Sequence, residues 1–221
     1  MAVKPVLAKK KKKGWYEILS PESMGRNVIG ESTVYESQDL VGRTLKLNLS
    51  IIMNDMKKQN IDAEFEITSV KEGKAETEIT GLYLTQSYMK RMVRRGKDKV
   101  DDSFLAVSKD KKTLRVKPVI ITNSKAANAL NTALRLKMRE LVQEALNEKS
   151  AEEFFSDLVS QKFQRETKDK LSKIYPLRYI DVRQALEVKN AKTPVIPVAK
   201  KKEKDVKEKA EEPAPEAATS K

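Results

Sequence analysis

The stretch "IDAEFEITSVKEGKAETEITGLYL", residues 61–84, contains two alternating segments joined by a short polar turn. In the first segment, apolar residues occupy every second position and acidic residues lie between them. A period of two is typical of a strand with one buried face. The turn "KEGK" is built around Gly73, and "AETEITGLYL" returns after it. The stretch therefore predicts a β-hairpin.

Strand patterns also lie on both sides of this hairpin. "RTLKLNLSII", residues 43–52, alternates with Leu45, Leu47, Leu49 and Ile51 on one face, which predicts a half-buried strand. "DSFLAVS", the turn "KDKK" and "TLRVKPVII" predict a second hairpin over residues 102–121. Pro118 indicates that the second strand of that hairpin lies at an edge of the sheet or ends there.

The period changes after residue 123, where "KAANALNTALRLKMRELVQEALNEK" is typical of a long helix. Its apolar stripe consists of Ala127, Leu130, Leu134, Met138, Leu141 and Ala145. Ser150 and Glu153 form a potential capping box for a second helix, and a third helical stretch stops at Pro176. "PLRYIDVRQALEV" predicts a final strand. We therefore expect an α+β fold: a mainly antiparallel β unit with about three helices inserted before its last strand.

The two ends of the chain have compositions unlike the middle. Residues 1–13 hold six lysines and no acid, and residues 191–221 consist largely of Lys, Glu, Ala and Pro. Neither segment has enough apolar surface to order itself by burial. We expect a single domain over residues 14–190 between two disordered tails.

The composition favours a binding protein over an enzyme. The 221 residues include no cysteine and no histidine, and the net charge is +13. Disulfides, thiolate metal sites and the usual zinc sites are thereby excluded, and no cofactor is expected. No apolar run is long enough to cross a bilayer, and no signal peptide is expected. The positive charge predicts a polyanionic partner; nucleic acid is favoured over membrane because no basic amphipathic helix has a bulky aromatic face.

Three motifs suggest chemistry at first sight but have structural explanations. "GRNVIGES", residues 25–32, has the outline of a phosphate-binding loop, yet Glu31 stands where that loop needs lysine. We interpret it as a loop running into a strand. Asp101 and Asp102 are adjacent, and adjacent residues of a strand point to opposite faces. Glu152 and Glu153 lie in the first turn of the expected helix, where the helix dipole stabilises acidic residues. No nucleophile with a base beside it is visible.

"SYMKRMVRRGKDK", residues 87–99, is the most informative internal stretch. As a short helix it would place Met89, Met92 and Val93 on a narrow apolar stripe, with basic residues opposite and Gly96 as the C-terminal stop. A solvated face usually mixes charges of both signs, and this one has no acid before Asp98. We interpret it as a phosphate-facing surface; the alternative is a face that is merely soluble.

Further basic residues complete a set of candidate RNA contacts. They come from the N-terminal run, the segment above, the long helix and the flanks of the last strand: Lys9, Lys10, Lys11, Lys12, Lys13, Lys90, Arg91, Arg94, Arg95, Lys97, Lys99, Arg135, Arg139, Arg178 and Arg183. Because aromatic residues make up only 5% of the chain, base stacking is not expected as the main mode of binding. We expect Trp15 and Tyr16 to anchor the first strand on the core, so that the preceding lysines reach RNA; a solubilising tail is the alternative.

Several phrases together resemble one family. "KKGWYEI", "NVIGES", "VGRTLKLNLS", "MKRMVRRGKDKV" and "KIYPLRYIDVR" are similar, in order and spacing, to the S3Ae (eS1) family of archaeal and eukaryotic small-subunit ribosomal proteins, here of archaeal type. The resemblance covers about residues 13–189 and implies a β-barrel-like core with packed helices. Tyr83 and Gln86 depart from the charged residues expected of the family at those positions.

The resemblance also implies a function. A protein of this family is a structural constituent of the small ribosomal subunit in the cytoplasm, without catalytic activity. It would lie on the platform near the mRNA exit, bind small-subunit rRNA near its 3′ end and contact neighbouring ribosomal proteins. The alternative is a basic chromatin or regulatory protein that binds nucleic acid away from the ribosome; a histidine-free enzyme is a weaker third hypothesis.

Overall fold

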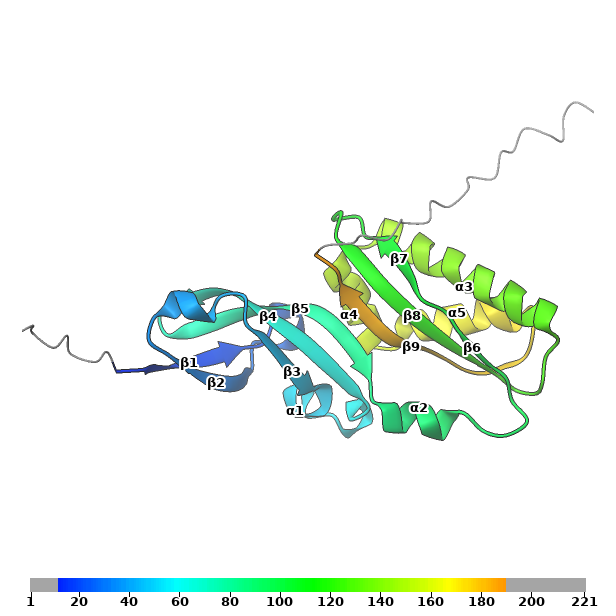
Figure 1. The fold of residues 1–221 in the computed structure, drawn as a ribbon, viewed down its shortest axis with the longest axis horizontal. Coiled ribbons are helices and arrows are strands. Elements are labelled where there is room, and N and C mark those ends of the chain that lie inside the picture. The colour runs from blue at the N-terminus through cyan, green and yellow to red at the C-terminus, as the bar shows by residue number, and fades with distance from the viewer. Residues whose placement is uncertain (1–11, 190–221) are drawn as a thin grey trace, which may run out of the picture.

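The computed structural model describes residues 12–189 and has the α+β class expected (Figure 1). The strands are β1 (Gly14–Leu19), β2 (Val28–Val34), β3 (Thr44–Asn48), β4 (Ile61–Lys71), β5 (Lys74–Leu84), β6 (Lys99–Asp101), β7 (Phe104–Val107), β8 (Thr113–Thr122) and β9 (Leu177–Glu187). The helices are α1 (Leu49–Met53), α2 (Gln86–Met92), α3 (Asn128–Glu148), α4 (Ala151–Val159) and α5 (Lys162–Ser172), with short 3₁₀ helices η1 (Glu22–Met24), η2 (Ser37–Leu40) and η3 (Met56–Lys58). As expected, three helices separate the last strand from the others.

The strands form one open sheet in the order β2-β1-β5-β9-β8-β6, with β3 paired to β4, β4 to β5, and β7 to β8. Only β1 and β5 run parallel, so the sheet is mainly antiparallel, as expected. Within residues 12–189 the ends of the sheet do not pair with each other. The barrel-like closure implied by the family resemblance is therefore replaced by an open sheet.

The hairpin at residues 61–84 is present and forms the longest ladder of the sheet. β4 and β5 are joined by Glu72 and Gly73 alone, and both have positive φ, at 50° and 81°. Two central residues with positive φ make a type I′ turn, whose twist matches that of the strands. Phe65 of β4 is fully buried in the main core, while Ile67 is buried in a smaller cluster near β1 and β2. The hairpin thus joins the two parts of the sheet.

The three long helices cover one face of the sheet, and α2 packs on the other. Met138 of α3 and Phe154 of α4 share the main core with Ile120 of β8. Val119 and Ile121, on either side of Ile120 in β8, belong instead to a cluster with Met89 and Met92 of α2. Neighbouring residues of a strand point to opposite faces, so α2 lies across the sheet from α3.

The α3 stripe is partly as expected. Leu134, Met138 and Leu141 are buried, but Ala127 is exposed because it precedes the helix as its N-cap. Val142 and Leu146 extend the buried face instead. The expected capping box is confirmed: the Ser150 hydroxyl accepts a hydrogen bond from the Glu153 amide, and the Glu153 carboxylate accepts one from the Ser150 amide.

Residues 43–52 form a strand for only half of their length, so this prediction was partly wrong. β3 ends at Asn48, whose side chain accepts a hydrogen bond of 3.0 Å from the Ser50 amide and so caps α1. The cap starts a helix despite the alternating pattern. Ile51, expected on the buried face, is 73% exposed.

The edge prediction for Pro118 was also wrong. β8 pairs with β9 on one side and with β6 and β7 on the other. Pro118 has no amide proton to donate, but it is tolerated at this position for two reasons. The register against β9 shifts at Pro118, and on the other side Pro118 falls in the gap between the residues paired with β7 and those paired with β6.

Two smaller expectations need correction. α2 ends at Met92, before Val93, which is exposed, and Gly96 with φ of 77° belongs to the loop that follows. Trp15 does not anchor β1: its side chain is 72% exposed, and Tyr16, on the opposite face, packs against the smaller core cluster instead. "NVIGES" does run into a strand, β2, as expected.

Candidate nucleic-acid interface

The basic segment after α2 is held in place by the apolar side of that helix. Met89 and Met92 are buried against β8, which leaves Lys90 and Arg91 exposed on α2. The Arg91 guanidinium donates a hydrogen bond of 2.8 Å to the Asn60 side chain and lies 5.9 Å from the Tyr88 ring centroid. Arg91 is thus fixed in orientation, while its charge has no carboxylate partner among residues 12–189.

The structure brings this segment next to the start of β9. Burial, followed by repulsion from Arg178 and Arg94, lowers the pKa of Lys97. A hydrogen bond from Arg178, followed by attraction to that guanidinium, lowers the pKa of Tyr179, and Arg94 and Lys168 act in the same direction. The Arg178 guanidinium also lies 5.3 Å from the Tyr179 ring centroid. The segment after α2, helix α5 and the start of β9 therefore contribute to one cluster of positive charge.

We call Arg94, Lys97, Lys168 and Arg178 the Arg178 cluster. Within the described part of the chain none of the four forms an ion pair with a carboxylate, and Lys97 has only a hydrogen bond of 3.5 Å to Asn123. The nearby Asp98 carboxylate instead accepts a hydrogen bond from the Ala126 amide, which is the first cause of its lowered pKa. Like charges held together without a counter-charge favour a polyanionic ligand.

Both arginines of β9 occupy bulges. The register of β9 against β8 passes from Leu177 to Tyr179 and from Val182 to Gln184, so Arg178 and Arg183 are left without a partner residue on β8. A bulge re-aims the side chain of the extra residue. Arg183 is exposed and lies between two shallow hollows, one lined by Lys117 and Asp101 and the other by Lys46 and Tyr83.

Arg139 differs from the other candidates because its charge is already paired. Its Nε and Nη2 both donate to the Asp102 carboxylate, the latter at 2.6 Å. Burial by itself would raise the pKa of Asp102, but the hydrogen bonds from Arg139 and from the Ser103 amide keep it below its ordinary value. Arg135, one turn earlier on α3, is exposed. Asp102 thus serves as a structural partner of α3.

The remaining candidates do not join the Arg178 cluster. Lys99 pairs with Asp101 at 2.5 Å, and Arg95 is exposed in the loop after α2. Lys12 and Lys13 are exposed immediately before β1, and β1 lies at the end of the molecule far from α3 (Figure 1). Lys9, Lys10 and Lys11 lie outside the described residues. Lys168 and Tyr179 were not among the residues predicted from the sequence, since a single lysine on a helix and a tyrosine in a strand give no local signal.

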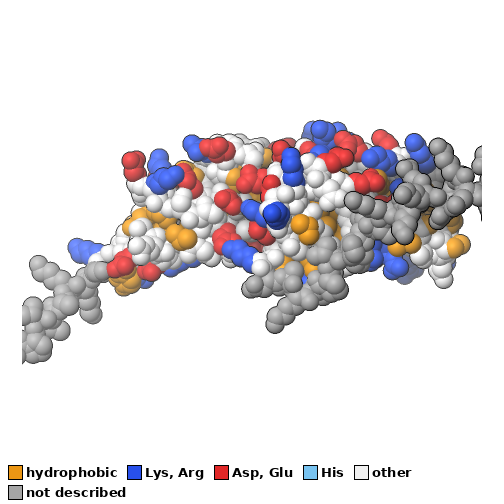
Figure 2. Space-filling model, turned by 90° about the horizontal axis from the view of Figure 1, so that it is seen from above, with side chains coloured by type: hydrophobic (Ala, Val, Ile, Leu, Met, Phe, Trp, Pro, Cys, Tyr) orange, Lys and Arg blue, Asp and Glu red, His pale blue; other side chains and the backbone are white. Residues whose placement is uncertain are grey.

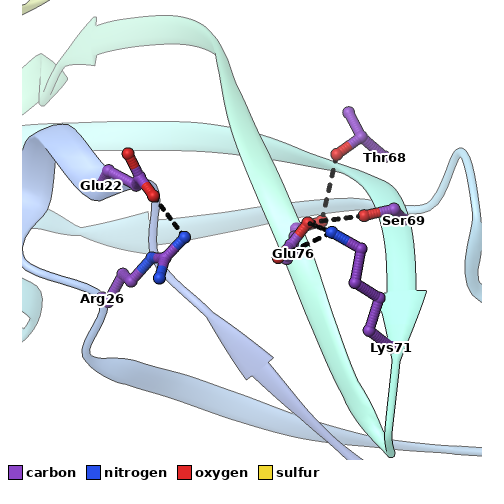
Figure 3. Close-up of polar contacts among 6 residues, drawn as sticks. All are labelled: Glu22, Arg26, Thr68, Ser69, Lys71 and Glu76. Atoms are coloured by element: carbon purple, nitrogen blue, oxygen red, sulfur yellow. Dashed lines mark hydrogen bonds and ion pairs between the residues drawn. The ribbon is translucent and has the colours of Figure 1, made fainter.

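Other surfaces carry charges of both signs. On the face shown in Figure 2, basic and acidic side chains are interspersed. Figure 3 shows two examples: Glu22 pairs with Arg26, and Glu76 accepts hydrogen bonds from Ser69 at 2.8 Å and Lys71 at 3.2 Å. These contacts, the Ser69 bond first, lower the pKa of Glu76. Such paired charges contrast with the unpaired cations of the Arg178 cluster.

Within residues 12–189 no three Asp or Glu residues gather in a way that could hold a metal ion, and none of the described helices is long and apolar enough to cross a membrane. Fold and surface together define a basic α+β protein with a concentrated, unneutralised cationic surface. The chain belongs to the Ribosomal S3Ae family, whose model matches residues 2–192.

Curated relatives agree with this assignment, and the match to this chain covers most of the length of each relative. The protein named small ribosomal subunit protein eS1 from Nanoarchaeum equitans is 32% identical over 184 residues, which are 83% of this chain and 93% of the relative. The proteins of the same name from Halorubrum lacusprofundi and Methanothermobacter thermautotrophicus are each 31% identical, over 83% and 78% of this chain and 86% and 88% of the relatives. The archaeal type expected from the sequence fits these relatives.

Proposed function

We propose that this chain is a structural, non-enzymatic constituent of the small ribosomal subunit, where it associates with rRNA and with other ribosomal proteins and supports translation in the cytoplasm. The observation that carries the proposal is the family match over residues 2–192, together with relatives whose name is small ribosomal subunit protein eS1. The unpaired cations of the Arg178 cluster support the rRNA part of it.

The Arg178 cluster is the proposed centre of rRNA contact. Phosphate oxygens between Arg94, Lys97 and Arg178 would replace their mutual repulsion by attraction, and they would release counterions from the RNA. Guanidinium groups also suit phosphate because they donate two parallel hydrogen bonds. Lys90, Arg91 and Arg95 would extend this surface along α2 and its loop. Arg135, Arg183 and the N-terminal lysines are proposed as separate contacts.

The finer location rests on the family resemblance. It favours the platform near the mRNA exit, with rRNA near its 3′ end and mRNA in the vicinity. The division into one domain over residues 14–190 with two tails is part of the same proposal.

Cosedimentation tests the ribosomal role. The full chain should sediment with small subunits at low salt and be released as salt rises, because phosphate contacts weaken with ionic strength. A chain that leaves the subunits at low salt and sediments with DNA or with other RNA would contradict the proposal and favour the chromatin or regulatory alternative.

A pair of variants tests the proposed surface. Arg94→Ala with Lys168→Ala removes two exposed, unpaired cations, one in a loop and one on a helix. The matched control, Lys71→Ala with Lys137→Ala, removes two cations that carboxylates already neutralise. In a titration of small-subunit rRNA at several salt concentrations, the first variant should bind more weakly. The slope of the logarithm of its affinity against the logarithm of the salt concentration should be shallower by about 0.9 for each phosphate that it no longer neutralises. Equal affinities and slopes in the two variants would contradict the assignment of the cluster.

A further inference from the structure

Trp15 is the one tryptophan of the chain, and the core does not use it. It pairs with Thr33 across the β1–β2 ladder, and its side chain points away from the face on which Ile18 is buried and Tyr16 partly buried. Trp15 is 72% exposed, and no aromatic ring or cation within residues 12–189 contacts its indole. A tryptophan held on a regular strand yet left open to solvent offers a flat binding surface.

A second aromatic ring and a cation share this face. Gly14 pairs with Val34, so Lys13 and Tyr35 follow as the next pair, and residues two apart on a strand point to the same side. The Lys13 ammonium lies 5.2 Å from the centroid of the Tyr35 ring, which is 55% exposed. Trp15 and Tyr35 are diagonal neighbours across the ladder, a relation that spaces residues by about 7–8 Å.

The charges on this face are divided, with lysines on one side of Trp15 and glutamates on the other. Lys12 and Lys13 lie on the outer side of Trp15, and the sequence before them is lysine from residue 9 onward. On the inner side, Glu17 pairs with Glu31, and both are exposed. A ligand on Trp15 would therefore have its negative charge toward the lysines and could offer hydrogen-bond donors toward the two carboxylates.

An unpaired nucleotide has this combination of groups. Its base stacks on indole, its phosphate suits lysine, and the amino groups of cytosine, adenine or guanine donate to carboxylates. A purely apolar peptide would leave the lysines and both glutamates without partners. The face is also separate from the Arg178 cluster, because β1 and β2 form the end of the molecule far from α3 (Figure 1).

We propose that the face formed by Lys13, Trp15 and Tyr35 binds an unpaired nucleotide of RNA, with the base stacked on the Trp15 indole and the phosphate beside Lys13. The choice of RNA as the ligand rests on the proposed function. The stacking site adds a local, base-contacting mode to a protein whose other RNA contacts are with phosphates.

The sole tryptophan reports directly on this site. Titration of the full chain with a short single-stranded oligoadenylate should quench Trp15 fluorescence to saturation, and an RNA duplex of the same length should quench it much less. Stacking on an aromatic ring is worth about 1–3 kcal/mol per base, so Trp15→Ala should weaken binding of the oligoadenylate about 5- to 150-fold. Trp15→Phe should restore part of the affinity.

Two controls separate this inference from the proposed function. Ile51→Ala removes an equally exposed apolar side chain, 73% exposed on α1, and should not change the affinity. Arg94→Ala with Lys168→Ala should weaken binding of small-subunit rRNA but leave the quenching by oligoadenylate intact. Circular dichroism of Trp15→Phe checks that the fold is retained.

The outcomes are distinct. Salt-dependent rRNA binding without quenching, and with Trp15→Ala unchanged, would overturn the stacking site while leaving the proposed function standing. Loss of all RNA binding in the unmodified chain would overturn both. Quenching by a small-subunit protein, and not by oligoadenylate, would overturn the nucleotide assignment and mark the face as a protein contact.

Discussion

Arg135 and Arg139 lie one helical turn apart on α3 and have the same chemistry, yet their surroundings give them different roles. Arg139 donates two hydrogen bonds to Asp102 and lies 5.7 Å from the Phe104 ring centroid, whereas Arg135 is exposed. The Asp102 side chain is only 9% exposed. Removing Arg139 would therefore leave a largely buried carboxylate without its main partner.

Arg139→Ala should lower the free energy of unfolding by about 1.5–3 kcal/mol, since hydrogen bonds between charged groups in partly buried sites are worth about that much. Arg135→Ala, the matched control on the same helix, should stay within about 0.5 kcal/mol. Urea denaturation of both variants at neutral pH measures the difference. Equal stabilities of the two variants would show that the Arg139–Asp102 pair contributes nothing to folding.

Asp181 is the buried carboxyl group of β9, and it gives the fold a pH dependence. Its Oδ1 accepts hydrogen bonds from the Val182 amide at 3.0 Å and from Gln164 at 3.4 Å, but burial dominates and raises the pKa of Asp181 from 3.8 to about 6. Between these two values the folded chain binds more protons at this site than the unfolded chain. The free energy of unfolding therefore falls as pH rises through this window, and the penalty is fully present above about pH 6.

Asp181→Asn should remove this penalty, because the amide stays neutral and its oxygen can still accept from Val182. The variant should be more stable than the unmodified chain at about pH 7.5, by up to about 3 kcal/mol, and should show little gain at about pH 4. Urea denaturation at the two pH values gives the comparison, and Asp169→Asn, at an exposed position on α5, is the control. A stability change of the same size at both pH values would contradict the argument.

At the scale of secondary structure elements, short polar signals decide where helices begin. Asn48 ends an alternating segment and opens α1, and Ser150 with Glu153 opens α4 immediately after α3. In both cases a side-chain oxygen accepts from a backbone amide that has no partner within the helix. A single cap can therefore override or confirm the longer hydrophobic pattern around it.

Ser150→Ala should lower the free energy of unfolding by about 1 kcal/mol, since it removes the hydroxyl that accepts from the Glu153 amide. Ser156→Ala, at an exposed position inside the same helix, is the matched control and should be neutral within about 0.5 kcal/mol. Thermal denaturation of both variants checks the prediction. If the melting temperatures of the two variants coincide, the capping box does not stabilise α4.

At the scale of the whole molecule, the basic residues divide into separate regions. The Arg178 cluster draws its cations from the loop after α2, from α5 and from the start of β9, while Lys12 and Lys13 mark the opposite end of the sheet beside β1. The long β4–β5 hairpin connects the two parts through shared core clusters. An RNA partner in contact with both regions would have to extend along the molecule or fold around it.

A chain that begins at Gly14 lacks six lysines. Its melting temperature should be nearly unchanged, because the described contact that it loses, between Lys13 and the Tyr35 ring, lies at the exposed end of β1. Its affinity for small-subunit rRNA should have a shallower salt slope, by about 0.9 for each phosphate that the missing lysines would have neutralised. A chain that ends at Lys189 is the control, since residues 191–221 hold eight lysines against six acids. A salt slope unchanged after the N-terminal truncation would show that the lysines only solubilise the protein.

The sequence alone determined the features that depend on neighbours in the chain. The hairpin at residues 61–84 follows from a period of two and a glycine turn, α3 from a helical stripe, and α4 from a Ser-x-x-Glu cap. The absence of cysteine and histidine and the excess of lysine and arginine indicated a binding protein in the same way. The hairpin, helix and cap signals each lie within one continuous segment, where local geometry acts directly, and the composition does not depend on how the chain folds.

The tertiary structure decided everything that depends on residues far apart in the chain. Arg178 faces the cations after α2 because β9 pairs with β8 in a register with a bulge at that residue. Arg139 has a structural role because α3 packs where its guanidinium can donate to the Asp102 carboxylate. Trp15, expected in the core, points outward because Tyr16 and Ile18 take the buried face of β1. Alternation along a strand shows that its two faces differ, but only packing against the rest of the molecule selects which face is buried.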